Sequence, residues 1–197
     1  MKKIAIFLVA AILLSILAGC NNTPKKVSEP RVKLLYEDEG DGLIFDSWTG
    51  YFDFDNDETK ERVKVRVLDP DDKSYSQYLN VKIGVFETTI EGVDRVHVEA
   101  IYGCDIDPND EAWDLAVFTI EQSADPRVFI FKYNENLEPY VFWRTDYNGE
   151  EAGENCYWLG YIDKPYFDIT ADNKIILRTQ TGSRGMWYVN RIFSLDD

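Results

Sequence analysis

The sequence predicts an all-β fold built from antiparallel sheets. Most periodic segments alternate apolar and polar residues with a period of two, as Val63, Val65 and Val67 do with Lys64 and Arg66. Turn-forming residues interrupt these segments about every 8 to 15 positions, which is typical of successive hairpins. No segment of ordinary helix length shows the spacing of an amphipathic helix. These three observations together favour strands throughout the folded part of the chain.

The expected strands follow this alternation along the chain. They cover residues 32–36, 43–48, 62–67, 81–85, 96–100, 115–121, 127–133, 140–144, 157–162, 174–181 and 186–193. Turns are expected at 69–70, 91–92, 148–149, 172–173 and 182–185, because Asp, Asn, Gly and Pro favour turn conformations.

The first twenty residues predict export and a membrane anchor. Lys2 and Lys3 precede an apolar run over 4–14, and small residues lead to Cys20. This is the pattern of a secretory signal, and the run is too short for a stable membrane span. Residues 17–20, Leu-Ala-Gly-Cys, resemble a bacterial lipobox, which implies cleavage after a signal peptide of residues 1–19 and lipid (palmitate) attachment to Cys20. We therefore expect an extracytoplasmic protein anchored to the bacterial cell membrane.

The rest of the chain is expected to hold a polar tether and one domain. Residues 20–30 contain Pro24 and Pro30, and residues 31–197 are long enough for a single sizeable core. Without Lys2 and Lys3, 19 basic residues face 36 acidic ones, a net charge of −17. Because such a field repels nucleic acid and anionic lipid surfaces, cations or neutral ligands are the expected partners.

An acidic segment followed by a strand occurs twice and leaves a decayed third copy. The first acidic loop contains Asp53, Asp55, Asp57, Glu58 and Glu61. The second acidic loop contains Asp105, Asp107, Asp110, Glu111 and Asp114, with one residue inserted near Pro108. The third copy contains Asp168, Thr170, Asp172 and Asn173. Spacings of 52 and 63 residues suit a repeated unit of about four strands, the size of a propeller blade.

The first acidic loop has the chemistry of a calcium site. Carboxylates at positions 1, 3 and 5 of a tight turn converge, and a carbonyl at position 7 and an acid at position 9 can complete an oxygen shell that suits calcium. The ligands in this loop would be Asp53, Asp55, Asp57, the carbonyl of Thr59, and Glu61. In the second loop they would be Asp105, Asp107, Asp110 and Asp114. A solvated acidic turn without metal is the alternative for both loops.

The pattern resembles the FG-GAP and VCBS repeats of integrin-like propellers and of secreted bacterial proteins, including lipoproteins. In that family the three aspartates and the position-nine acid bind calcium in a loop between two strands of a blade. The resemblance implies blade-like sheets in an incomplete, propeller-like arrangement; a β-sandwich or barrel is the alternative. Position six is usually glycine, which tolerates positive φ, but Glu58 and Glu111 stand there in this chain.

Two cysteines remain after lipidation of Cys20. In an oxidising compartment Cys104 and Cys156 could pair as a disulfide. The alternative, a nucleophilic thiol with His97 as its base, is disfavoured because nothing in the sequence brings the two together. His97 is the single histidine, and its place on the polar face of a strand is more typical of a surface histidine than of a general base.

The sequence favours a lipid-anchored binding module over an enzyme, since it contains no local catalytic motif. Its acidic loops would hold structural calcium, and an envelope protein or a carbohydrate would be the ligand. The alternative is a carbohydrate-active enzyme of the cell envelope with Asp105 and Asp114 in a cleft beside Trp113.

The tryptophans are expected to pack in the core rather than stack on sugars. They are Trp48, Trp113, Trp143, Trp158 and Trp187.

Overall fold

The computed structural model describes residues 30–38, 47–68, 76–94, 96–107, 109–121, 126–145, 151–159, 166–181 and 187–193. The chain divides into two compact units, Met1–Pro30 and Arg31–Asp197, and all the described strands belong to the second. The expected signal peptide, Cys20 and most of the tether lie outside the described residues. In the part of the chain that is described, no helix is long and apolar enough to cross a membrane.

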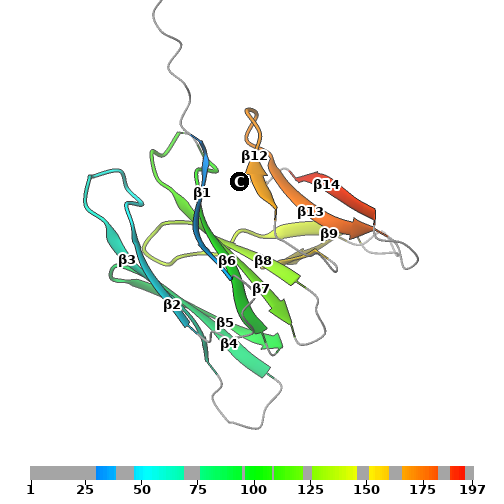
Figure 1. The fold of residues 1–197 in the computed structure, drawn as a ribbon, viewed down its shortest axis with the longest axis horizontal. Coiled ribbons are helices and arrows are strands. Elements are labelled where there is room, and N and C mark those ends of the chain that lie inside the picture. The colour runs from blue at the N-terminus through cyan, green and yellow to red at the C-terminus, as the bar shows by residue number, and fades with distance from the viewer. Residues whose placement is uncertain are drawn as a thin grey trace, which may run out of the picture. The chain divides into compact units, whose positions relative to one another are not determined.

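The described residues form β-strands and no helix, which confirms the all-β prediction (Figure 1). In chain order the strands are β1 (Val32–Glu37), β2 (Ser47–Phe52), β3 (Glu61–Leu68), β4 (Ser76–Ile83), β5 (Phe86–Asp94), β6 (Val96–Cys104), β7 (Asp114–Glu121), β8 (Pro126–Phe131), β9 (Phe142–Thr145), β10 (Glu151–Glu154), β11 (Tyr157–Trp158), β12 (Phe167–Ile169), β13 (Ile175–Thr181) and β14 (Trp187–Phe193).

These strands form antiparallel sheets. One sheet has four strands in the order β2-β3-β4-β5, and the next has five in the order β1-β6-β7-β8-β11. A third sheet has the order β12-β13-β14, and β9 pairs with β10. Among the described strands no sheet closes on itself, so the barrel alternative is wrong for this part of the chain.

The first core lies between the four-stranded sheet and one face of the five-stranded sheet. Strand β3 contributes to this core because its valines, which alternate with more exposed residues, are all buried. This burial confirms the period-two alternation of the sequence. The core contains Phe54, Val63, Val65, Val67, Leu79, Val81, Ile83, Val98, Ile101, Trp113, Leu115, Val117, Phe129, Phe131 and Leu137.

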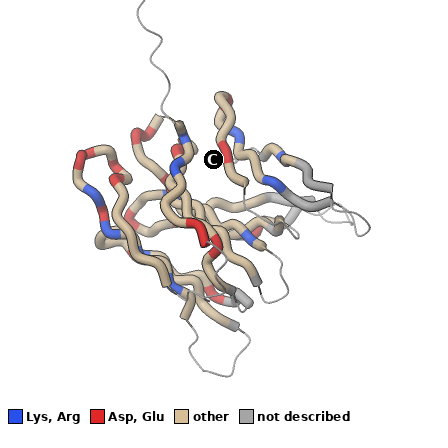
Figure 2. Tube along the Cα trace, in the orientation of Figure 1, with Lys and Arg blue, Asp and Glu red and all other residues tan. Residues whose placement is uncertain are grey.

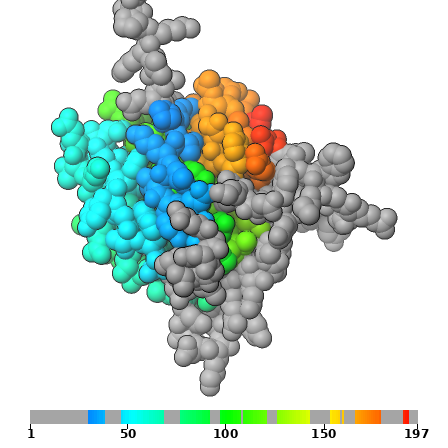
Figure 3. Space-filling view, viewed as in Figure 1, coloured from blue at the N-terminus to red at the C-terminus, as the bar shows by residue number. Residues whose placement is uncertain are grey.

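The second core lies on the other face of the five-stranded sheet, against β12 and β13. It contains Ala100, Cys104, Ile106, Ala116, Phe118, Val128, Ile130, Tyr140, Phe142, Leu159, Phe167, Ile169, Ile175 and Leu177. The central sheet is therefore covered on both faces, and every residue of β8 is buried. Figure 1 shows β2–β5 on one side of β6–β8 and β12–β14 on the other. Strand β1, at the edge of the central sheet, contacts β12 (Figure 3).

One strand prediction and one turn prediction around β5 are wrong. Residues 81–85 were expected to form one strand, but Gly84 and Val85 form the tight turn between β4 and β5, and Gly84 has a φ of 58°. Residues 91–92 were expected to form a turn, but β5 runs through them. Gln77 pairs with Val93 and Tyr78 with Glu91, so residue 92 is the extra residue of a β-bulge.

Other strand boundaries differ from the sequence predictions. The strand expected over 43–48 is β2, which begins at Ser47, and residues 39–46 lie outside the described part. Strands β5, β10 and β12 were not expected. The expected turns at 69–70, 148–149 and 182–185 lie outside the described residues.

Candidate functional site

The first acidic loop connects β2 to β3 and brings three carboxylates together. One ligand oxygen from each of Asp53, Asp55 and Glu61 lies within 4.8 Å of the others. Figure 2 shows acidic residues gathered in this connection. These residues occupy positions 1, 3 and 9 of the loop, and their convergence means that the loop could hold a metal ion.

Backbone N–H groups fix the orientation of these carboxylates. The N–H of Glu58 donates to Asp53 Oδ2 at 3.1 Å, and the N–H of Phe54 donates to Glu61 Oε2 at 2.8 Å. The first bond crosses the loop, and the second joins its start to its end. These two bonds hold the loop in a closed form.

The chain reaches this form by adopting left-handed backbone conformations at two non-glycine residues. Asn56 has a φ of 56° and Glu58 a φ of 70°. Glu58 is the position where the resembling family has glycine, so the loop adopts the backbone that glycine would favour although glutamate stands there. Glu111, the corresponding residue of the second loop, has a φ of 57°. The left-handed residue thus repeats in the second loop.

One carboxylate oxygen of this cluster is buried and has no hydrogen-bond partner among the described residues. Asp53 Oδ1 is shielded from solvent, whereas Oδ2 of the same group accepts from Glu58. A buried anionic oxygen without a partner costs free energy, and a cation beside it would remove that cost. The donor set of three carboxylates therefore fits a hard divalent cation.

The negative charge of this loop affects the neighbouring Tyr133. Its ring stacks on Phe54 with the centroids 5.3 Å apart. Burial, followed by the negative charge of Glu61 and of the loop aspartates, raises the pKa of Tyr133 to about 12. The charge of the loop therefore reaches an aromatic side chain of the first core.

One of the predicted first-loop ligands, Asp57, belongs to a different arrangement. Asp57 is not among the three converging carboxylates; its Oδ1 accepts the N–H of Thr59 at 2.7 Å. This contact makes Asp57 the cap of the turn. Coordination by the carbonyl of Thr59 remains a prediction.

The predicted ligands at the start of the second loop have partners that keep them apart. Asp105 Oδ2 lies 3.4 Å from Arg31 Nε. Asp107 Oδ1 accepts the N–H of Asn109 at 2.9 Å and its side-chain amide at 2.8 Å, and these bonds lower the pKa of Asp107. Asp110 Oδ1 accepts the N–H of Ala112 at 3.0 Å. Each of these three carboxylates therefore has a separate partner.

Asp114, the fourth predicted ligand of the second loop, is buried in the core. It is 4% exposed, and its oxygens accept the N–H of Tyr133 at 3.1 Å and the hydroxyl of Tyr140 at 2.9 Å. Burial raises the pKa of Asp114 to about 7. The second acidic loop is thus not among the groups in the described residues that could hold a metal ion, and a calcium site there stays a prediction.

The same contacts disfavour the predicted pair of catalytic carboxylates. Asp114 is enclosed by protein and Asp105 faces Arg31, so the two do not present open carboxyl groups to one substrate. Trp113, expected beside them, is 7% exposed and belongs to the first core. Trp48 also packs against this core, which agrees with the expected packing role. The side chains of Trp143, Trp158 and Trp187 lie outside the described part.

The two acidic loops contact each other. The N–H of Trp113 donates to the carbonyl of Phe54 at 2.7 Å, and Asn56 Nδ2 donates to the carbonyl of Glu111. These bonds join loops that are about one repeat apart in the sequence. The two acidic loops are therefore neighbours in space, joined by main-chain and side-chain hydrogen bonds.

The third copy forms a compact turn between β12 and β13. Thr170 Oγ1 donates to Asp172 Oδ1 at 2.6 Å and accepts the N–H of Lys174 at 2.9 Å. Asn173 has a φ of 63°. Lys174, together with Thr170, lowers the pKa of Asp172 to about 2. The turn prediction at 172–173 is confirmed.

Cys104 and Cys156 do not form the predicted disulfide. Cys104 ends β6 and lies in the second core, whereas Cys156 packs against the first core. The two cores are on opposite faces of the central sheet, which explains why the thiols do not meet. Burial, and then the charge of Asp114, raises the pKa of the Cys104 thiol well above its usual range, so it is not a reactive thiolate.

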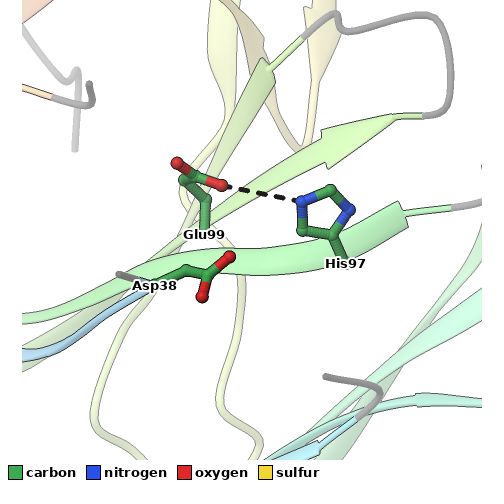
Figure 4. Close-up of side chains that lie close together, drawn as sticks. All are labelled: Asp38, His97 and Glu99. Carbon is green, nitrogen blue, oxygen red and sulfur yellow. Dashed lines mark ion pairs between the residues drawn. The ribbon is translucent and has the colours of Figure 1, made fainter. Parts of the chain in front are cut away.

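A second cluster that could hold a metal ion contains Asp38, His97 and Glu99 (Figure 4). The position of His97 on the polar face of a strand predicted a surface histidine. His97 and Glu99 are two residues apart in the sequence, which was a signal that their side chains could lie together. Asp38 joins them only through strand pairing.

No family model matches the chain, and neither the curated proteins nor the solved structures give a match.

Proposed function

We propose that this chain is an extracytoplasmic binding module, anchored to the bacterial membrane through a lipid on Cys20, in which the first acidic loop binds calcium. The observation that carries the proposal is the convergence of Asp53, Asp55 and Glu61, with Asp53 Oδ1 buried and without a hydrogen-bond partner in the described part of the chain. Calcium would stabilise the connection between β2 and β3 and would leave the sheets to present the binding surface.

Calcium suits this loop better than other cations that are common outside the cell. Its ligands are hard oxygens, and calcium accepts irregular shells completed by carbonyls and water. Magnesium demands near-ideal octahedral geometry and loses its water reluctantly. The three carboxylates leave further positions, for which the carbonyl of Thr59 and water are the proposed ligands.

The resemblance to FG-GAP and VCBS repeats supports a role in binding an envelope protein or a carbohydrate. The four-stranded, five-stranded and three-stranded antiparallel sheets pack through two cores, which is compatible with an incomplete, propeller-like arrangement. In this proposal the calcium loop lies in the connection between two strands of the first blade. The burial of Asp114 argues against the enzyme alternative.

Thermal unfolding tests the calcium proposal. Extracytoplasmic modules bind calcium with dissociation constants of about 10⁻⁴ to 10⁻³ M. About 5 mM calcium should therefore stabilise the protein by about 1 kcal/mol or more relative to chelator, a rise in Tm of about 3 °C. Magnesium at the same concentration should give a smaller rise.

A matched pair of variants assigns the effect to one loop. Asp55→Asn should abolish most of the calcium response and retain the fold in chelator, because it removes a repelling charge. Asp107→Asn, in the second loop, should keep the full response. An equal Tm in chelator and calcium, or an unchanged response in Asp55→Asn, would disprove the proposal.

Fractionation of cells tests the anchor. Replacing Cys20 with alanine should release the protein from the membrane fraction or stall its processing, since the lipobox resemblance places the lipid on this residue. Unchanged partition into the membrane, with no lipid mass on Cys20 in the unsubstituted protein, would rule the anchor out.

A further inference from the structure

A mixed nitrogen and oxygen cluster lies at the junction of β1 and β6, away from the calcium loop. It consists of Asp38, which follows β1, and of His97 and Glu99 on β6 (Figure 4). One ligand atom from each side chain lies within 4.8 Å of the others. His97 Nε2 and Glu99 Oε2 are already 3.6 Å apart.

The backbone positions this cluster through two independent features. Val98 pairs with Thr119 and Ala100 with Phe118, so Glu99 is the extra residue of a β-bulge. A bulge redirects a side chain from the regular alternation. The N–H of Asp38 donates to the carbonyl of Glu99 at 2.8 Å, which holds the end of β1 against this bulge. The three side chains are thus brought together by strand pairing rather than by a mobile loop.

We propose that Asp38, His97 and Glu99 form a binding site for a divalent transition-metal ion of the zinc class. Imidazole nitrogen is a ligand for zinc, copper, nickel and iron but not for calcium or magnesium, which take oxygen. Zinc accepts histidine nitrogen together with carboxylate oxygen at about 2.0 to 2.2 Å. Ligand atoms at such distances in a tetrahedral shell are about 3.4 Å apart, close to the observed separation of His97 and Glu99.

The surroundings suit an open site rather than a closed one. The side chains of His97 and Glu99 are 31% and 20% exposed, so they are partly fixed by packing but reachable from solvent. Three protein ligands leave a fourth position for water or for a group of a bound partner. The high negative charge of the chain adds attraction for any cation. The site shares no residue with the calcium loop, so the two can bind independently.

Titration of the full chain with zinc tests this proposal. The protein is purified in detergent without a histidine tag, and zinc is added in the presence of about 5 mM calcium, which occupies the first acidic loop. Because His97 is the single histidine, the imidazole contributes one set of nuclear magnetic resonance signals. Zinc should shift these signals and bind with one-to-one stoichiometry.

Variants separate this site from the calcium loop. His97→Gln and Asp38→Asn should each weaken zinc binding by about tenfold or more. Asp55→Asn should leave it unchanged while removing the calcium response. The proposal is overturned if the imidazole signals do not move at saturating zinc, or if His97→Gln binds zinc as the parent does. A circular dichroism spectrum of each variant confirms that the fold is retained.

Discussion

In the first acidic loop Asp53, Asp55 and Glu61 point to one place, whereas the carboxylates of the second acidic loop point to different partners. Both loops have a left-handed residue at the corresponding position, Glu58 and Glu111. The difference lies in what surrounds each carboxylate. A repeated sequence pattern therefore fixes the turn, and the neighbours decide whether its charges converge.

Arg31 and Tyr140 are the neighbours that bind carboxylates of the second loop and direct them to different places. Arg31 faces Asp105 and donates to the carbonyls of Asp105, Ile106 and Thr170. Tyr140 holds Asp114 in the core. Among the described contacts, no arginine or tyrosine holds a carboxylate of the first loop in this way. Asp53 Oδ1 has no hydrogen-bond partner there and is available to bind a cation.

The largest expected effect comes from neutralising the buried Asp114. Its pKa is about 7 in the folded protein against 3.8 ordinarily, so the folded state holds the proton more tightly. Stability should then fall as the pH rises from about 4 to 7, by about 4 kcal/mol in total. Asp114→Asn keeps the shape and should be more stable than the parent at pH 8, as measured by chemical unfolding.

The pH profile gives the control for this variant. Near pH 4 the parent carries a neutral Asp114, so the two proteins should differ little. Equal stability of the parent and Asp114→Asn across pH 4 to 8 would show that burial does not set the ionisation of this carboxyl.

A smaller effect is expected from removing Arg31. Arg31→Met keeps the apolar stem but breaks the contact with Asp105 and the bonds to the loop carbonyls, and it should cost about 2 kcal/mol. The matched control is Lys82→Met, which removes a surface ion pair with Glu87 and should cost at most about 1 kcal/mol. An equal cost in urea unfolding would mean that Arg31 does not organise the second loop.

The smallest effect concerns the shared backbone. Glu58→Gly and Glu111→Gly should each stabilise the protein by about 0.5 to 1 kcal/mol, because glycine adopts positive φ without strain. Glu135→Gly, at an exposed turn position outside the positive-φ set, should destabilise it by a similar amount. If all three variants shift Tm in the same direction, backbone strain is not what distinguishes these positions.

The sequence predicted what depends on local pattern. The alternation of Val63, Val65 and Val67 correctly gave a buried strand face, and positions 1, 3 and 9 correctly gave Asp53, Asp55 and Glu61 as a cluster. These features depend on residues within one turn or one strand.

Long-range features could not be read in the same way. Asp38 meets His97 only because β1 pairs with β6. Asp114 looks like another loop acid in the sequence, and its burial depends on Tyr140, which is 26 residues away. Gly84 stands within an alternating segment, so the alternation predicted a strand where the positive φ of Gly84 allows a turn.

A crystal structure grown with about 5 mM calcium tests most directly whether the first loop, and not the second, holds the ion. We expect one calcium peak in the anomalous difference map, at about 2.3 to 2.6 Å from carboxylate oxygens of Asp53, Asp55 and Glu61. Asp105 should remain on Arg31, without a calcium peak in the second loop. An ion bound by Asp105 and Asp107, or first-loop carboxylates that turn apart with no ion between them, would contradict this account.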